Sequence, residues 1–212
     1  MSERPILFSA EMARAILDGG KTQTRRLSGL EEVNNYTGSL SGETIQGFGD
    51  TGYKGLMPSD YYIRPYYKSQ YKNNPKQFHW FLGEKEREIN PIPVKCPYGV
   101  PGDRLWVRET FSYGEQTRYR ADLGLMVWHD TDQKWSPSIF MPRWASRIDL
   151  LIKDIRVERV QDITPSDARA EGAETVENYI LLWDKLNAKR GYGWDVNPYV
   201  WVIEFEVMKW LS

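Results

Sequence analysis

The chain has 212 residues and one cysteine, Cys96, so it is long enough to bury a hydrophobic core and cannot form an internal disulfide. Its net charge of −1 excludes a protein coated in the positive potential that duplex DNA attracts. Because no apolar run approaches the ~20 residues that cross a bilayer and no signal-peptide core follows the N-terminus, we expect a cytoplasmic protein with no membrane partner.

The first elements are a strand, a helix and a second strand. Residues 5–8 predict a short strand, and Ser9 is a suitable N-cap for the helix that follows. The apolar residues on one face of that helix are Met12, Ala13, Ile16 and Leu17. Gly19 and Gly20 provide a C-terminal stop. Residues 22–27 then predict a strand, and Lys21 lies directly before its first residue.

The composition changes over residues 28–93, where Gly, Ser, Asn and Tyr dominate and neither a helical nor a strand period persists. We predict an insertion rather than part of the core. Its tyrosines, too numerous for a disordered linker, include Tyr36, Tyr53, Tyr61, Tyr62, Tyr66, Tyr67 and Tyr71. We expect this segment to cover the mouth of a pocket as a lid. A flap that only stabilises the fold is an equally good interpretation.

The core resumes at Val100-Pro101-Gly102-Asp103, a type II turn signal. Residues 105–111 predict a strand, in which Leu105, Val107, Glu109 and Phe111 alternate with Trp106, Arg108 and Thr110. Residues 148–160 predict a longer strand whose apolar phase slips, and this indicates a bulge at Lys153-Asp154.

The last third predicts two helices and a strand. Thr164-Pro165-Ser166-Asp167 matches a capping box that opens a short helix containing Glu171 and ending at Gly172. Residues 175–187 predict a second helix, and residues 199–207 a strand with one buried face. Strands that outnumber a few helices, without regular βαβ alternation, predict a mixed α+β fold around a small closed sheet.

Two familiar nucleotide-site motifs are excluded. Gly20-Lys21-Thr22 is not a P-loop, because Ala15 stands where that loop needs glycine. The chain also lacks the His-x-Glu and Pro-Cys-x-x-Cys motifs of zinc deaminases. We expect neither a metal nor a cofactor.

Lys21, Thr24 and Glu171 form the candidate catalytic set, since an amine, a hydroxyl and a carboxylate together suit hydrolysis. In one mechanism Thr24 attacks an acyl carbonyl after Lys21, whose pKa is lowered by burial among Arg25 and Arg26, takes its proton. Glu171 then donates a proton to the leaving amine. Direct attack by water with Glu171 as base is an equal alternative.

Arg143, Trp144 and Arg147 are candidates for holding a phosphate and a base. The alternative is a half-buried strand end with no role in binding, and the two interpretations are about even.

Three motifs resemble those of ASCH domains in the PUA-like superfamily. They are Gly19-Gly20-Lys21-Thr22-Gln23-Thr24-Arg25-Arg26 after the first helix, Gly102-Asp103-Arg104-Leu105 at a strand entry, and Ala168-Arg169-Ala170-Glu171 on the short helix. The final strand also matches at Val202-Ile203-Glu204-Phe205, so the resemblance covers about residues 4–27 and 96–209. Further segments look like an ASCH group carried by phages and prophages: residues 4–8, 141–147 and 191–195.

The resemblance implies a single domain over residues 1–212. It would be a small PUA-like β-barrel with a few flanking helices, interrupted by the Tyr-rich insertion at 28–93. It also implies the cytoplasm of a bacterial host cell as the location. A nucleoside or single-stranded nucleic acid is the implied ligand, with a host protein as a partner of residues 28–93.

Bacterial N4-acetylcytidine amidohydrolases belong to the same superfamily. Matching their motifs implies catalytic roles for Lys21, Thr24 and Glu171 and a substrate-binding role for Arg26. The implied activity is removal of an acyl group from a modified nucleobase or nucleoside such as N4-acetylcytidine. The alternatives are a non-catalytic module that binds nucleic acid or a modified base, and an ASCH-type ribonuclease that uses Lys21 and Glu171 as base and acid.

Overall fold

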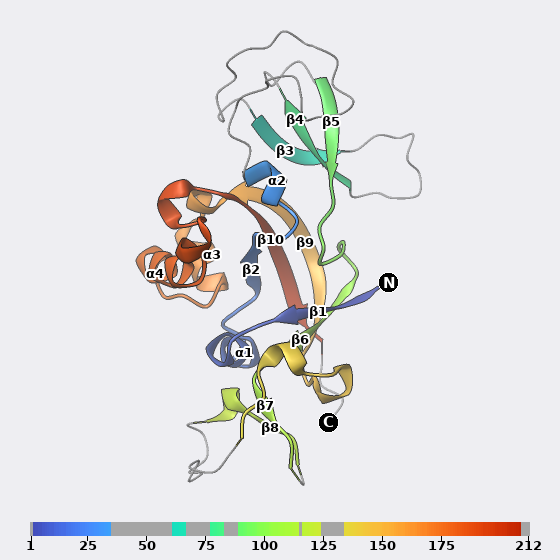
Figure 1. The fold of residues 1–212 in the computed structure, drawn as a ribbon, viewed down its shortest axis with the longest axis vertical. Helices are drawn as coiled ribbons and strands as arrows, with labels where there is room; N and C mark the ends of the chain where they lie inside the picture. The colour runs from blue at the N-terminus through green and yellow to red at the C-terminus, as the bar shows by residue number, and fades with distance from the viewer. Residues whose placement is uncertain are drawn as a thin grey trace.

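The fold is that of a computed structural model, drawn in Figure 1. It describes residues 2–34, 61–66, 77–82, 89–114, 116–123 and 134–208. The remaining parts of the insertion, and with them most of the segment expected to form a lid or to take a protein partner, lie outside the described residues.

A five-stranded sheet forms the centre of the molecule, in the spatial order β1-β6-β9-β10-β2. Its strands are β1 (Glu3–Leu7), β6 (Arg104–Arg108), β9 (Asp149–Arg159), β10 (Tyr199–Val207) and β2 (Gln23–Arg26). β1 and β6 pair in parallel, whereas all other neighbours in this sheet are antiparallel. Together with a few helices this makes a mixed α+β fold, as predicted.

Two helices begin directly after the N-caps that the sequence predicted, Ser9 and Thr164. They are α1 (Ala10–Leu17), α2 (Glu31–Asn34), α3 (Pro165–Ala170) and α4 (Val176–Asn187). Ser9, Thr164 and Thr175 each accept a hydrogen bond from a backbone N–H in the first turn of α1, α3 and α4 respectively. Short 3₁₀ turns occupy Arg120–Asp122, Ser138–Phe140, Arg143–Ala145, Val160–Asp162, Ala188–Arg190 and Trp194–Val196. No helix of the described residues is long and apolar enough to span a membrane.

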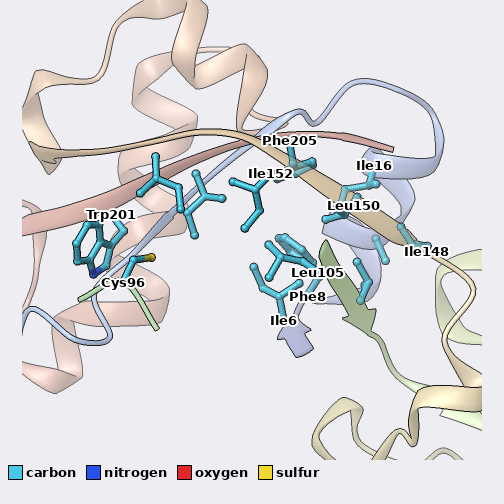
Figure 2. Close-up of a cluster of buried hydrophobic side chains, with 14 of the residues drawn as sticks. Ile6, Phe8, Ile16, Cys96, Leu105, Ile148, Leu150, Ile152, Trp201 and Phe205 are labelled. Atoms are coloured by element: carbon cyan, nitrogen blue, oxygen red, sulfur yellow. The ribbon is translucent and has the colours of Figure 1, made fainter. Parts of the chain in front are cut away.

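The main core fills the space between α1 and one face of the sheet. Side chains from β1, β6, β9 and β10 meet there, and Figure 2 shows Leu105, Ile152 and Phe205 among them. Ile16 of α1 closes this core, and Trp201 lies fully buried at its other end.

Both faces of β10 are buried, which differs from the single buried face predicted for residues 199–207. Trp201, Ile203 and Phe205 face the main core. Val200 and Val202 pack on the other face against a second cluster that includes residues of α4. The reason is that valines occupy the positions expected to be polar, and α3 and α4 cover them (Figure 1).

The slip predicted in the long strand is confirmed. Along β9 and β10, Asp154 pairs with Glu204 and Ile152 pairs with Phe205, so Lys153 is the extra residue of a bulge. Lys153 is exposed, which lets the strand keep apolar side chains on the core face on both sides of it.

The expected closed barrel is not confirmed. Among the described residues, backbone pairing leaves β1 and β2 as the two edges of an open sheet. A side chain bridges these edges instead, since Nη2 of Arg26 donates to the carbonyl oxygen of Leu7 at 2.7 Å.

The insertion differs from the prediction in two ways. Leu30 and Val33 are buried in the main core, so the first residues after position 28 belong to the core. In addition, β3 (Tyr61–Tyr66), β4 (Gln77–Leu82) and β5 (Ile89–Val94) form an antiparallel three-stranded sheet where no strand period was recognised. A two-stranded sheet of β7 (Phe111–Ser112) and β8 (Arg118–Tyr119) projects from the opposite end of the molecule (Figure 1).

Candidate active site

Lys21 and Glu171 lie in direct contact although 150 residues separate them. Nζ of Lys21 donates to Oε2 of Glu171 at 2.8 Å and to the Glu171 carbonyl oxygen at 2.7 Å. The two residues also form an isolated antiparallel β-bridge, beside which the Thr22 N–H donates to the Ala170 carbonyl at 2.8 Å. The loop after α1 and the end of α3 are therefore joined by both backbone and side chains.

Glycines at the ends of α1 and α3 allow this close approach. Gly19, with φ +77°, turns the chain out of α1 just before Lys21. Gly172, with φ +85°, follows Glu171, and a Cβ there would lie 3.3 Å from the Cβ of Ala15 and 3.5 Å from that of Lys21. A side chain at either glycine would strain the turn, and at Gly172 it would also crowd the lysine.

The ion pair is buried, with 0% of the Lys21 side chain and 5% of the Glu171 side chain exposed. Burial lowers the pKa of Lys21 from its ordinary value of 10.5, while the neighbouring Glu171 carboxylate opposes this shift. Burial also raises the pKa of Tyr179, which is close enough to Glu171 to feel its charge.

A cavity of about 240 Å³ lies in front of this pair. It is lined by Met12, Thr24, Arg25, Arg26, Leu27, Ser28, Tyr98, Glu171, Tyr179, Leu182, Trp183, Leu186, Asn187 and Arg190. Thr24 and Glu171 thus share one cavity, as the motifs suggested, whereas Lys21 lies behind Glu171 without contributing to the wall. Thr24 is fixed in β2, where it pairs with Ile203 of β10.

Arg25 holds the other oxygen of the Glu171 carboxylate, since its Nη1 lies 3.4 Å from Oε1. Its Nη2 lies 3.2 Å from Glu158 and 3.4 Å from Asp167. Arg156 ties these acids together by contacting both Glu158 and Asp167. Glu171 is therefore held between two cations, Lys21 and Arg25, which fixes the direction in which its carboxylate points.

Helix α4 forms a wall of the cavity that the sequence did not predict as part of a site. Tyr179, Trp183 and Asn187 lie four residues apart on one helical face, and all three are buried and line the cavity. The indole N–H of Trp183 donates to the Tyr192 carbonyl at 2.9 Å, which fixes its ring. The sequence held one signal for this wall, because Asn187 is a polar residue at the end of an otherwise apolar helical face.

Arg143, Trp144 and Arg147 do not line the cavity. Arg143 donates to Glu3 at 2.7 Å and to Asp149 at 3.0 Å. The Trp144 side chain is 70% exposed and lies against the ring of Tyr113.

Arg147 forms a second buried ion-pair cluster away from the cavity. Its Nε lies 2.9 Å from Glu109, which is 1% exposed, and its Nη1 lies 2.8 Å from Asp122. Its guanidinium also stacks 3.9 Å from the centroid of the Tyr119 ring. These contacts give Arg147 a structural role.

Comparison of the chain with protein-family models, with curated proteins and with solved structures finds no match. Within the described ranges, no group of three or more His, Cys, Asp and Glu side chains is arranged to hold a metal ion.

Proposed function

We propose that this protein is an amidohydrolase that removes an acyl group from a modified nucleobase or nucleoside such as N4-acetylcytidine. The observation that carries the proposal is the Glu171 carboxylate, held by Lys21 and Arg25 at the wall of a cavity that Thr24 also lines. A fixed carboxylate beside a hydroxyl is suited to general acid–base catalysis of acyl transfer.

In the proposed reaction, Glu171 takes a proton from a water molecule as the water oxygen attacks the acyl carbon. The tetrahedral intermediate then collapses, the carbon–nitrogen bond breaks, and Glu171 returns the proton to the leaving amine. The products are the free base or nucleoside and the carboxylic acid. Thr24, on the same wall, donates to the oxyanion of the intermediate.

Attack by Thr24 with Lys21 as its base is less well supported. Two of the three N–H donors of Lys21 are used by Glu171, at 2.7 and 2.8 Å, and its side chain has no exposed surface. Lys21 therefore acts in our proposal as a positioning residue that orients Glu171.

The size and lining of the cavity agree with a nucleobase as the reacting group. At about 240 Å³ it is smaller than the roughly 300–1,000 Å³ typical of pockets for drug-sized ligands. Tyr98, Tyr179 and Trp183 provide aromatic surface against which a base can stack. The Lys21 side chain has no exposed surface, which also disfavours a ribonuclease in which this amine takes a proton directly from a ribose hydroxyl.

We also propose that the fold is an ASCH-type, PUA-like one. The motif residues Lys21, Thr24 and Glu171 meet at one site, which is the arrangement that the family resemblance implies. The hydrogen bond from the Arg26 side chain to the carbonyl oxygen of Leu7, which joins β2 to the end of β1, also supports this proposal.

Incubation of the purified protein with N4-acetylcytidine tests the proposal. We expect cytidine and acetate to appear in equal amounts, measured by chromatography of the nucleoside and an enzymatic assay of acetate. Tight binding of N4-acetylcytidine without product would favour the non-catalytic module instead, and cleavage of an RNA oligonucleotide would favour the ribonuclease.

A further inference from the structure

Two guanidinium groups line the cavity without a carboxylate partner. Arg26 and Arg190 both contribute to its wall, and no carboxylate of the described residues forms an ion pair with either of them. Arg26 donates to a backbone carbonyl, that of Leu7, and Arg190 approaches the side-chain oxygen of Asn187 at 3.5 Å. Both acceptors are neutral, so neither guanidinium has a carboxylate partner among the described residues.

The other cations of the site do have carboxylate partners. Lys21 has a carboxylate oxygen at 2.8 Å, and Arg25 has three at 3.2 to 3.4 Å. Arg156 contacts Glu158, Glu204 and Asp167. Each cation of the wall behind Glu171 is therefore paired with at least one carboxylate, whereas Arg26 and Arg190 have no such partner among the described residues.

The Arg26 side chain is fixed at the wall by its hydrogen bond to the Leu7 carbonyl oxygen, while its fully covered Nε is closed to the cavity. The guanidinium is held in place by the Phe8 ring, whose centroid is 4.9 Å away.

Arg190 lies at the mouth of the same cavity. It is exposed, and so is Leu186, which lines the cavity one turn earlier and is 52% exposed. A nucleobase that reaches Glu171 places its sugar toward this mouth, and whatever is attached to the sugar then lies near Arg190.

We infer that the ligand of this cavity carries a phosphate on its ribose, with Arg190 binding the phosphate at the mouth and Arg26 supplying further positive potential along the wall. This inference rests on the proposed function for the identity of the base. Guanidinium groups bind phosphate with charge-assisted, often bidentate hydrogen bonds, which explains why two of them are kept without acidic partners. The phosphate belongs either to a free nucleotide or to an RNA strand.

Calorimetric titration of the intact protein with cytidine, cytidine 5′-monophosphate and a trinucleotide with a central cytidine tests this inference. The variant is Arg190→Gln, and the matched control is Lys189→Gln, which removes a neighbouring exposed charge that does not line the cavity. We expect a phosphate-bearing ligand to bind about ten- to a hundredfold more tightly than cytidine, as charge-assisted hydrogen bonds give. Arg190→Gln should abolish most of this preference and Lys189→Gln should keep it.

The two sources of phosphate are distinguished by the trinucleotide. If the trinucleotide binds more tightly than cytidine and this difference depends on Arg190, the natural ligand is an RNA strand. If only the monophosphate binds more tightly than cytidine, the natural ligand is a free nucleotide. Equal binding of all three ligands, no binding of any of them, or equal effects of the two substitutions would overturn the inference. Binding of unacylated ligands needs no catalysis, so a failed deacetylation assay with phosphate-dependent binding would reject only the proposed function.

Discussion

Lys21 is the residue on which the site most depends. Its ammonium group is completely covered, and a buried charge is tolerated only when it is paired and hydrogen-bonded. Glu171 meets this need with both its carboxylate and its carbonyl oxygen. A buried ion pair of this kind adds little net stability over an apolar pair, so its retention is better explained by the need for a fixed carboxylate in the cavity.

We predict that Lys21→Met lowers the free energy of unfolding by roughly 3–5 kcal/mol, because it leaves Glu171 buried without its main partner. The double variant Lys21→Met with Glu171→Gln should recover part of this loss. Urea denaturation followed by circular dichroism measures both changes.

The matched control for this prediction is Lys153→Met, which breaks an exposed lysine–glutamate pair. Lys153 lies 3.2 Å from Glu206, and both side chains are about half exposed. Loss of this exposed pair should lower the free energy of unfolding by no more than about 1 kcal/mol. Equal losses for the two lysines would contradict the structural interpretation of the buried pair.

Glu109 provides a prediction about pH. Burial raises the pKa of this carboxyl above its ordinary 4.5, although Arg147 opposes the shift. The folded state then holds the proton more tightly than the unfolded state, so the contribution of Glu109 to stability is present below pH 4.5 and is lost as the pH rises through the folded pKa.

We therefore predict that the stability of the natural protein relative to Glu109→Gln falls as the pH is raised from below 4.5 toward neutrality and then becomes constant. Urea denaturation of both proteins across this pH range gives the difference. A relative stability that increases with pH would mean that pairing with Arg147 outweighs burial.

At the scale of elements, α3 is the part of the fold that places Glu171. Its capping box is complete: the Asp167 N–H donates to Thr164 Oγ1 at 3.1 Å, and the Thr164 N–H donates to Asp167 at 3.0 Å. Asp167 also pairs with Arg25, which in turn contacts Glu171. The start of the helix and the Glu171 carboxylate are thus coupled through one guanidinium.

We predict that Thr164→Ala and Thr175→Ala each lower stability by about 1 kcal/mol, because each removes an N-cap. They should differ in their effect on catalysis. Thr164→Ala loosens the helix that carries Glu171 and should lower kcat, whereas Thr175→Ala loosens the α4 wall and should mainly raise KM. Steady-state kinetics with N4-acetylcytidine measures this, and identical effects on kcat would show that α3 has no special role.

Many helix starts and strands could be predicted because the residues that specify them lie close together in the sequence. Ser9 and Thr164 precede their helices with the expected caps, and the slip of apolar phase identified the bulge at Lys153. The three strands of the insertion were missed because no strand period persists there and their pairing is set by contacts across the chain.

The candidate site was predictable only in part. The sequence could single out Lys21, Thr24 and Glu171 as unusual residues within motifs. It could not show that Thr24 and Glu171 line the cavity while Lys21 lies behind Glu171. Arg147 could not be assigned, because its partners Glu109 and Asp122 come from other elements. For α4 the sequence predicted only a helix, since an aromatic stripe has the same pattern whether it covers a core or a ligand.

At the scale of the whole molecule, the central sheet brings the two ends of the chain together at the cavity. β2 comes from the N-terminal region and pairs with β10, the last strand, while α3 and α4 pack beside them (Figure 1). Ser28 and Tyr98, which flank the insertion, also line the cavity. Leu30 and Val33 still belong to the main core, so the chain leaves the core only after it has passed this wall of the proposed active site.

The most direct test of the central claim, that Glu171 performs the chemistry, is the turnover of N4-acetylcytidine by Glu171→Gln and by Glu109→Gln. Both substitutions neutralise a buried carboxylate that is paired with a cation, but only the first lies at the cavity. We predict that Glu171→Gln lowers kcat by about 10²–10⁴-fold, the range for loss of a general acid–base, while Glu109→Gln keeps the activity of the natural protein. Equal activity of the two variants, with both folded by circular dichroism, would contradict the claim.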